Sequence, residues 1–310
     1  MRAMPQSIID ILERENLPPN TRVTQVCQEI SDKHTPRVLA FLYYGSSLRD
    51  MDNPDKMLDF YVIVDSYRKT HKSRLRALLN KLIPPAVYYA ESLHQNDTLS
   101  TCKYSIISLE EFEKRCSKKS FLSLVWGRFS QPSALFFPVS DAVKNRIMVA
   151  REQAISHMAM ETQPLLDSPV SSTQFWARGF KESYKTELRP EASDARSEEI
   201  VRRYSERYED IMTALFGASQ KGLYSLPEST ASQRRSCKTR WFFRRVLGKP
   251  MTAIRVLNSA ATFDGGLDYV MRKLYNHSGV TIDVSPSQKR HPVLWSPVLA
   301  WKFWRKGAFK

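Results

Sequence analysis

The amino-acid sequence predicts an α/β domain, then a helical domain, then a basic C-terminal region. Apolar runs rich in β-branched and aromatic residues, typical of buried strands, cover 38–44, 58–64, 86–93 and 103–109. After residue 140 the apolar spacing becomes helical. Most of the positive charge follows residue 233. These changes place domain boundaries after residues 137 and 224, giving regions 1–137, 138–224 and 225–310.

Helical patterns lie between the strands of the first region. The segment from Pro5 to residue 15 has amphipathic spacing, and 72–83 is a second helical pattern that ends at Pro84. Strands with interspersed helices favour a mixed α/β domain. In the helical region, 140–160 begins with a Ser-Asp pair, and 197–217 has acids in its first turn and ends at a glycine, so each predicts a helix.

The charge of the chain is concentrated at its C-terminal end. The formal net charge is +15, and the segment 233–310 has sixteen Lys or Arg against three acids. Such an asymmetry predicts contact with a polyanion, either nucleic acid or an anionic membrane.

Cysteine spacing and hydropathy exclude several classes of protein. The four cysteines form no CxxC pair, so they indicate ordinary thiols in a reducing compartment rather than a zinc ribbon or a redox pair. The first sixteen residues carry acids within an apolar segment, which argues against a secretory signal. No apolar stretch approaches the roughly 18–20 residues of a membrane-spanning helix. We therefore expect at most a peripheral association with membranes.

A Gly-Ser-Ser sequence directly follows the first apolar run. Gly45 permits a tight turn, and the backbone N–H groups there, with the hydroxyls of Ser46 and Ser47, suit phosphate oxygens. Asp59 opens the next apolar run, where it would hold a magnesium ion against the same phosphates. This pattern is typical of nucleotidyltransferases, although a simple strand-to-loop turn with an edge acid explains the local features equally well.

The position of a second carboxylate does not follow from the sequence. Nucleotidyltransferases usually carry another acid two residues after the first, and Tyr61 occupies that position. Asp65 lies on the same strand face but roughly 20 Å away at about 3.3 Å per residue, too far to share a metal ion with Asp59. The remaining candidates are Asp50, Asp52, Asp55 and Glu91.

Several stretches together resemble the mitochondrial phosphatidate cytidylyltransferases of the translocator assembly and maintenance type and their bacterial relatives. They are YGSS at 44–47, MLDFYVIVD at 57–65, VYYAESL at 87–93, KYSIIS at 103–108 and WGRFSQP at 126–132, with weaker similarity to residue 217. The resemblance implies a nucleotidyltransferase domain, a winged-helix-like domain and a membrane-associating C-terminal region. It also implies the reaction of CTP with phosphatidic acid, with Mg²⁺ as cofactor, to give CDP-diacylglycerol and pyrophosphate.

The resemblance assigns expected roles to individual residues. Asp59 would bind magnesium and Lys103 would act with it in catalysis. Substrate binding would fall to Gly45, Ser46, Ser47, Asp65, His71 and Arg128. Three positions depart from the family pattern: Ser105 replaces a glycine, Gln131 a basic residue and Ser66 an aspartate.

The C-terminal residues suggest a membrane-binding helix. If the chain is helical after Pro297, Trp301 and Trp304 share one face, and Lys302, Arg305 and Lys306 lie on another. A tryptophan-rich face beside a basic one suits an anionic membrane surface, although docking on the protein itself is the alternative.

The resulting hypothesis is a bacterial-type phosphatidate cytidylyltransferase at the cytoplasmic face of the inner membrane. The implied phospholipid substrate favours a membrane over nucleic acid as the partner of the basic region, and the oligomeric state is left open. Two rivals are a nucleotidyltransferase that acts on RNA and a catalytically silent membrane-binding module on the same scaffold.

Overall fold

The computed structural model describes residues 7–34, 36–71, 74–82, 85–93, 99–187, 193–259, 271, 275, 279–290 and 292–307. The chain forms two compact units, each built from several segments. One contains residues 15–113, 132–147 and 250–310 and holds the sheet; the other contains 1–14, 114–131 and 148–249 and is mainly helical.

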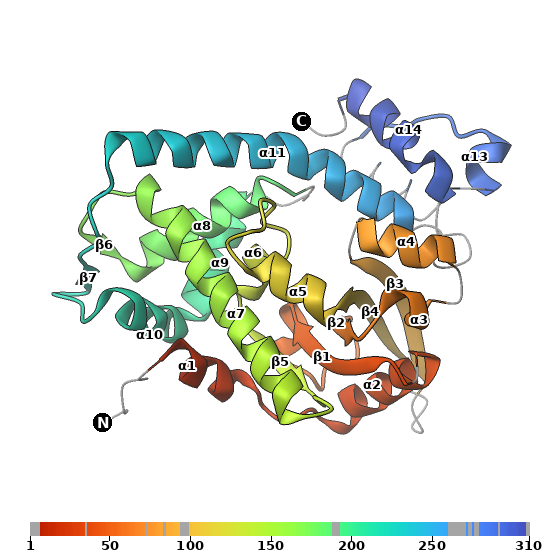
Figure 1. Cartoon of the computed structure of the whole chain (residues 1–310), viewed down its shortest axis with the longest axis horizontal. Helices are drawn as coiled ribbons and strands as arrows, with labels where there is room; N and C mark the ends of the chain where they lie inside the picture. Colours follow the sequence, from red (N-terminus) through yellow and green to blue (C-terminus); the bar gives the residue numbers. More distant parts are fainter. Residues whose placement is uncertain are drawn as a thin grey trace. The chain divides into compact units, whose positions relative to one another are not determined.

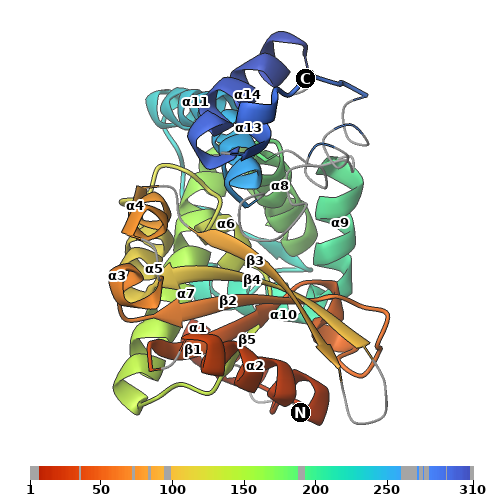
Figure 2. The same cartoon turned by 90° about the vertical axis from the view of Figure 1, so that its right-hand side faces the viewer.

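A five-stranded mixed sheet forms the centre of the sheet unit (Figure 2). Its order is β3 (Ala86–Leu93), β4 (Leu99–Ser108), β2 (Leu58–Val64), β1 (Val38–Tyr44) and β5 (Ser133–Phe136). The β2–β4 pair is parallel and the other pairs are antiparallel. The four strands expected from the apolar runs are present, and the sheet confirms the mixed α/β class.

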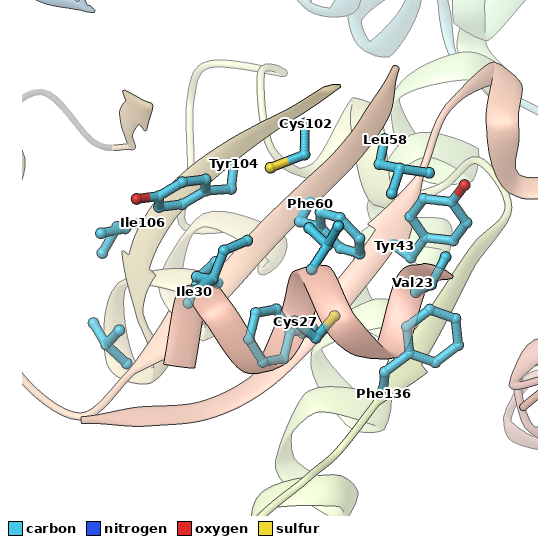
Figure 3. Packing of buried hydrophobic residues seen from close by; sticks show 14 of the residues in the cluster. Val23, Cys27, Ile30, Tyr43, Leu58, Phe60, Cys102, Tyr104, Ile106 and Phe136 are labelled. Atoms are coloured by element: carbon cyan, nitrogen blue, oxygen red, sulfur yellow. The ribbon is translucent and has the colours of Figure 1, made fainter. Parts of the chain in front are cut away.

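One face of this sheet carries the hydrophobic core. Helix α2 (Thr21–His34) packs there, with Val23, Cys27 and Ile30 directed toward the strands (Figure 3). The strands contribute alternate residues to this face, among them Tyr43, Phe41, Phe60, Val62, Tyr104, Ile106 and Phe136. Because side chains alternate along a strand, the intervening residues lie on the opposite face.

Short helices complete the sheet unit. They are η1 (Ser46–Arg49), α3 (Tyr67–Thr70), α4 (Arg74–Leu82), α13 (Pro286–Arg290) and α14 (Pro292–Arg305). The expected helix over 72–83 is thus observed as α4, and the segment after Pro297 is helical, as part of α14.

The other unit is built mainly from helices (Figure 1). Three helices have several residues in both units, namely α5 (Leu109–Cys116), α7 (Asp141–Thr162) and α11 (Ala231–Ser259), and α1 (Ile8–Glu15) passes into the sheet unit at its last residue. The remaining elements are α6 (Trp126–Phe129), η2 (Gln163–Leu165), α8 (Ser172–Tyr184), α9 (Ser193–Arg203), α10 (Ser205–Phe216), and a small sheet of β6 (Val170–Ser171) and β7 (Leu223–Tyr224). The single helix expected over 197–217 is two helices, which separate at Tyr204, where φ is −124° and ψ is 36°.

A buried ionic cluster stabilises the helical unit. The Glu161 carboxylate accepts hydrogen bonds from Arg244 at 2.7 Å and from Arg240 at 3.1 and 3.2 Å. Burial raises the pKa of Glu161, but the ion pairs with these arginines outweigh it and hold the pKa below its ordinary value. Burial lowers the pKa of the neighbouring His157 to about 4, so this imidazole is neutral at neutral pH.

None of the described helices combines the length and the apolar composition needed to cross a membrane.

Candidate functional site

The face of the sheet opposite α2 carries a row of polar side chains. Asp59 on β2 is the register partner of Lys103 on the parallel strand β4. Tyr44 on β1 and Tyr89 on β3 extend the same row on either side. Register partners on neighbouring strands project to the same face, so this row places an acid, a base and two phenols next to one another.

Gly45 shapes the end of this row. Its φ of +97° and ψ of −164° belong to a backbone region that is essentially restricted to glycine. A Cβ atom at this position would lie 3.0 Å from Oδ2 of Asp59. The glycine therefore allows the turn after β1 to approach the Asp59 carboxylate closely.

A second row of side chains lies beside the first on the same face. Tyr61 and Ser105 are register partners and are 3% and 4% exposed. The rings of Tyr44 and Tyr61 lie 5.5 Å apart. Further along, Tyr89 donates a hydrogen bond to Glu91 at 2.9 Å. The sequence prediction did not assign Tyr61 or Ser105 to the site, although their two-residue spacing from Asp59 and Lys103 indicates the shared face.

The two serines of the turn differ in their surroundings. Ser46 is exposed at the start of η1, whereas Ser47 is fully buried. The Ser47 hydroxyl faces the phenol of Tyr43, which belongs to the core on the α2 side. Burial raises the pKa of that phenol to about 12. Of the two hydroxyls, that of Ser46 is thus the one exposed to solvent.

The loop between the Gly45 turn and Asp59 is held by a single arginine of α2. The Arg22 guanidinium donates to the backbone carbonyls of Met51, Asn53, Pro54 and Lys56 at 2.7–3.3 Å. Its Nε also donates to Ser100 on β4 at 2.7 Å. Arg22 therefore fixes the loop that connects the two strands of the candidate site.

The four remaining acids have different environments. Asp50 pairs with Lys56 at 2.8 Å within the loop, and Asp52 accepts a hydrogen bond at 2.6 Å from Asn20, which directly precedes α2. Asp55 is exposed in the loop. Glu91, by contrast, lies on the same sheet face as Asp59.

These residues meet the minimum requirement for magnesium. Among the described residues, no group of three His, Cys, Asp or Glu side chains could hold a metal ion. However, Mg²⁺ in phosphate sites usually retains waters and uses only one or two protein carboxylates together with substrate phosphates. Asp59, beside the Gly45 turn, would supply one such carboxylate.

Two residues implied by the resemblance lie elsewhere in the sheet unit. Asp65 follows the far end of β2, about 20 Å along the strand from Asp59, and pairs with Arg37 at 2.9 Å. The His71 ring lies 3.0 Å from the Tyr88 hydroxyl, on the α2 side of the sheet, and 3.0 Å from the Asn80 amide. His71 is 7% exposed, and the structure does not bring either residue to the Asp59 row.

Arg128 belongs to the helical unit. It lies on α6 and forms an ion pair of 3.9 Å with Glu187. Its proposed role in substrate binding stays a prediction of the resemblance.

The C-terminal helix α14 has one buried side and an exposed aromatic side. Leu299, Ala300 and Phe303 are buried, whereas Trp301 and Trp304 are 51% and 60% exposed. The guanidinium of Arg305 lies 4.9 Å from the centre of the Trp301 ring. Lys302 and Lys306 donate to the carbonyls of Asp283 and Thr281 at 3.5 and 2.9 Å. One side of α14 is therefore buried, and the two lysines bind the segment before α13, while the tryptophans face solvent.

Comparison with protein-family models found no match, and comparison with curated proteins found none either.

Proposed function

We propose that this protein is a CTP:phosphatidate cytidylyltransferase that makes CDP-diacylglycerol and pyrophosphate. The observation that supports the proposal is the register pairing of Asp59 with Lys103 next to the Gly45 turn. A carboxylate that could hold Mg²⁺, an ammonium group and a glycine turn are groups that phosphoryl-transfer sites commonly use.

In the proposed reaction a phosphate oxygen of phosphatidic acid attacks the α-phosphorus of CTP. A new P–O bond forms, the bond from the α-phosphorus to the bridging oxygen breaks, and pyrophosphate leaves with the electron pair. The attacking oxygen is already an anion, so the protein has mainly to align the groups and stabilise charge. When bound, Mg²⁺ held by Asp59 would neutralise phosphate charge.

The other residues would bind and orient the triphosphate. Lys103 would donate charge-assisted hydrogen bonds to phosphate oxygens from the strand next to Asp59. The backbone at Gly45 and the Ser46 hydroxyl would contact phosphate at the turn. Arg128 lies in the helical unit, so its part in stabilising pyrophosphate rests on the resemblance alone.

A nucleotide-selective lipid product is the first expected result. Purified protein incubated with magnesium, CTP and phosphatidic acid vesicles should release pyrophosphate and form a CDP-lipid, whereas ATP and GTP should give only a small fraction of that rate. Pyrophosphate release and lipid chromatography measure the reaction. Comparable use of CTP, ATP and GTP would favour an RNA-acting enzyme, and no turnover with any nucleotide would favour a silent scaffold.

We further propose that the protein binds the cytoplasmic face of the bacterial inner membrane. The exposed tryptophans of α14 and the nearby cations Lys302, Arg305 and Lys306 supply the apolar and electrostatic contributions of an interfacial helix. Such a location would bring the enzyme to a phospholipid substrate.

Removal of the two exposed indoles should weaken vesicle binding. For the variant Trp301→Ala/Trp304→Ala we expect at least about tenfold weaker sedimentation with anionic vesicles, since tenfold corresponds to only about 1.4 kcal/mol of lost apolar burial. High salt should weaken binding further. The control Leu17→Ala removes a side chain that is 59% exposed outside this helix. Equal binding by both variants would leave α14 as a purely internal docking helix.

A further inference from the structure

Three cations surround one buried carboxylate in the helical unit. Glu182 on α8 is buried. Its carboxylate lies 3.4 Å from Nε of Arg178, 3.4 Å from Nζ of Lys185 and 3.8 Å from Nη1 of Arg245. Among the described residues, no other carboxylate lies within ion-pair distance of these three cations. The cluster therefore carries an excess of two positive charges.

The contacts within this cluster are loose. Charge-assisted N–H···O bonds usually measure about 2.7–2.9 Å, the distance that Glu161 and Arg244 reach in the same unit. All three distances to Glu182 are longer. Nε of Arg178 is buried and has no hydrogen-bond partner among the described residues. A single carboxylate thus satisfies only part of the donor capacity of two guanidinium groups and an ammonium group.

The three cations remain accessible to a ligand. Their side chains are 38%, 32% and 38% exposed for Arg178, Lys185 and Arg245, whereas that of Glu182 is 7% exposed. An anion that approaches from solvent would meet the cations, with the carboxylate behind them. Two arginines and a lysine are also the groups that bind phosphate oxygens best, because guanidinium groups donate in a bidentate manner.

An exposed aromatic side chain lies on the same side of α11 as Arg245. Phe242 precedes Arg245 by three residues on α11, so the two share one side of the helix, and Phe242 is 54% exposed. This combination of phosphate-binding cations and an exposed apolar group suits a phosphate that is attached to an apolar chain as well as a free phosphomonoester.

We propose that Arg178, Lys185 and Arg245 form a binding site for a phosphomonoester group, with Glu182 holding the three cations in place when the site is empty. The phosphate would replace the carboxylate as the main partner of the two arginines. The site does not depend on the proposed transfer reaction, because binding can be measured without CTP.

Because Glu182 competes with the phosphate for the same cations, removing its charge should increase the affinity for the ligand. In the variant Glu182→Gln the competing carboxylate is removed, so glycerol 3-phosphate should bind about tenfold more tightly, the equivalent of one charge-assisted hydrogen bond. If the cluster is only an internal ion pair, the same variant should lose stability without any gain in binding. Isothermal titration calorimetry with glycerol 3-phosphate, alongside thermal unfolding, separates the two outcomes.

If Glu182→Gln fails to fold, a second variant tests whether the cations bind a phosphomonoester. Arg178→Gln/Arg245→Gln keeps the Glu182–Lys185 contact and should bind glycerol 3-phosphate at least about tenfold more weakly than wild type. The control Lys181→Gln/Arg235→Gln also removes one cation from α8 and one from α11, but Lys181 already pairs with Asp194 at 2.7 Å. Equal affinity of these two double variants would overturn the proposal.

The source of the phosphate follows from a parallel measurement with vesicles. Sedimentation with phosphatidylcholine vesicles that contain phosphatidic acid should show the same order of variants if the ligand is a lipid headgroup. An effect with glycerol 3-phosphate alone would assign the site to a soluble phosphomonoester. If the variants and the control behave alike with both probes, the site does not exist.

Discussion

Asp59→Asn should abolish turnover while the protein still folds and binds vesicles. Asp59 lies beside the Gly45 turn and in register with Lys103, so its carboxylate is the group best placed to neutralise phosphate charge. Asparagine has nearly the same shape but no charge, and it is a poorer ligand for Mg²⁺ than a carboxylate. We expect the rate of pyrophosphate release to fall about 10³-fold or more at saturating magnesium.

The control for this variant is Asp32→Asn. Asp32 is exposed on α2, on the opposite side of the sheet, where it accepts a hydrogen bond from Gln28 at 2.9 Å. This change also removes one negative charge from the unit but should leave the rate within about twofold, as is usual for surface substitutions. Circular dichroism and thermal unfolding show whether each variant is folded. Near wild-type turnover by a folded Asp59→Asn protein would refute the assignment of the site.

The strands of the sheet were predictable because their apolar character is continuous. The runs 38–44 and 58–64 became β1 and β2 with those same bounds. Helix α2 was not predicted, although its core residues Val23, Val26, Cys27 and Ile30 have the i, i+3, i+4, i+7 spacing of an amphipathic helix, and Asn20 before it accepts a hydrogen bond from the Val23 N–H. The sequence thus contained the signal for this helix, and the structure adds the sheet face that its apolar side covers.

Part of the candidate site was predictable because two of its residues interrupt or end apolar runs in the sequence. Asp59 and Gly45 are marked by their contrast with apolar neighbours, whereas Lys103 came from the resemblance. The register that pairs Lys103 with Asp59 depends on a parallel pairing of strands that are more than forty residues apart, which no local pattern determines. Asp65 and His71 illustrate the converse: closeness in sequence to Asp59 did not place them at the same end or face of the sheet.

The helical unit was harder to foresee because its core is partly ionic. Arg244 and Glu161 are both buried, with side-chain exposures of 2% and 4%. A basic residue within RWFFRR gives no sign in the sequence that it points inward. In the structure its guanidinium lies 4.7–5.3 Å from the ring centres of Phe121, Trp126 and Trp241, and its Nε donates to the Phe121 carbonyl at 2.7 Å.

Glu161→Gln should therefore lower the stability of the helical unit by about 3–5 kcal/mol, because it leaves the buried charge of Arg244 without its carboxylate. Urea unfolding at neutral pH, followed by tryptophan fluorescence, measures the loss. The double variant Glu161→Leu/Arg244→Met removes both charges and should recover a large part of it, since apolar replacements of a buried pair are often nearly neutral. The control Glu113→Gln breaks an exposed pair with Arg146 and should cost less than about 1 kcal/mol. A Glu161→Gln protein as stable as this control would show that solvent, not the carboxylate, compensates Arg244.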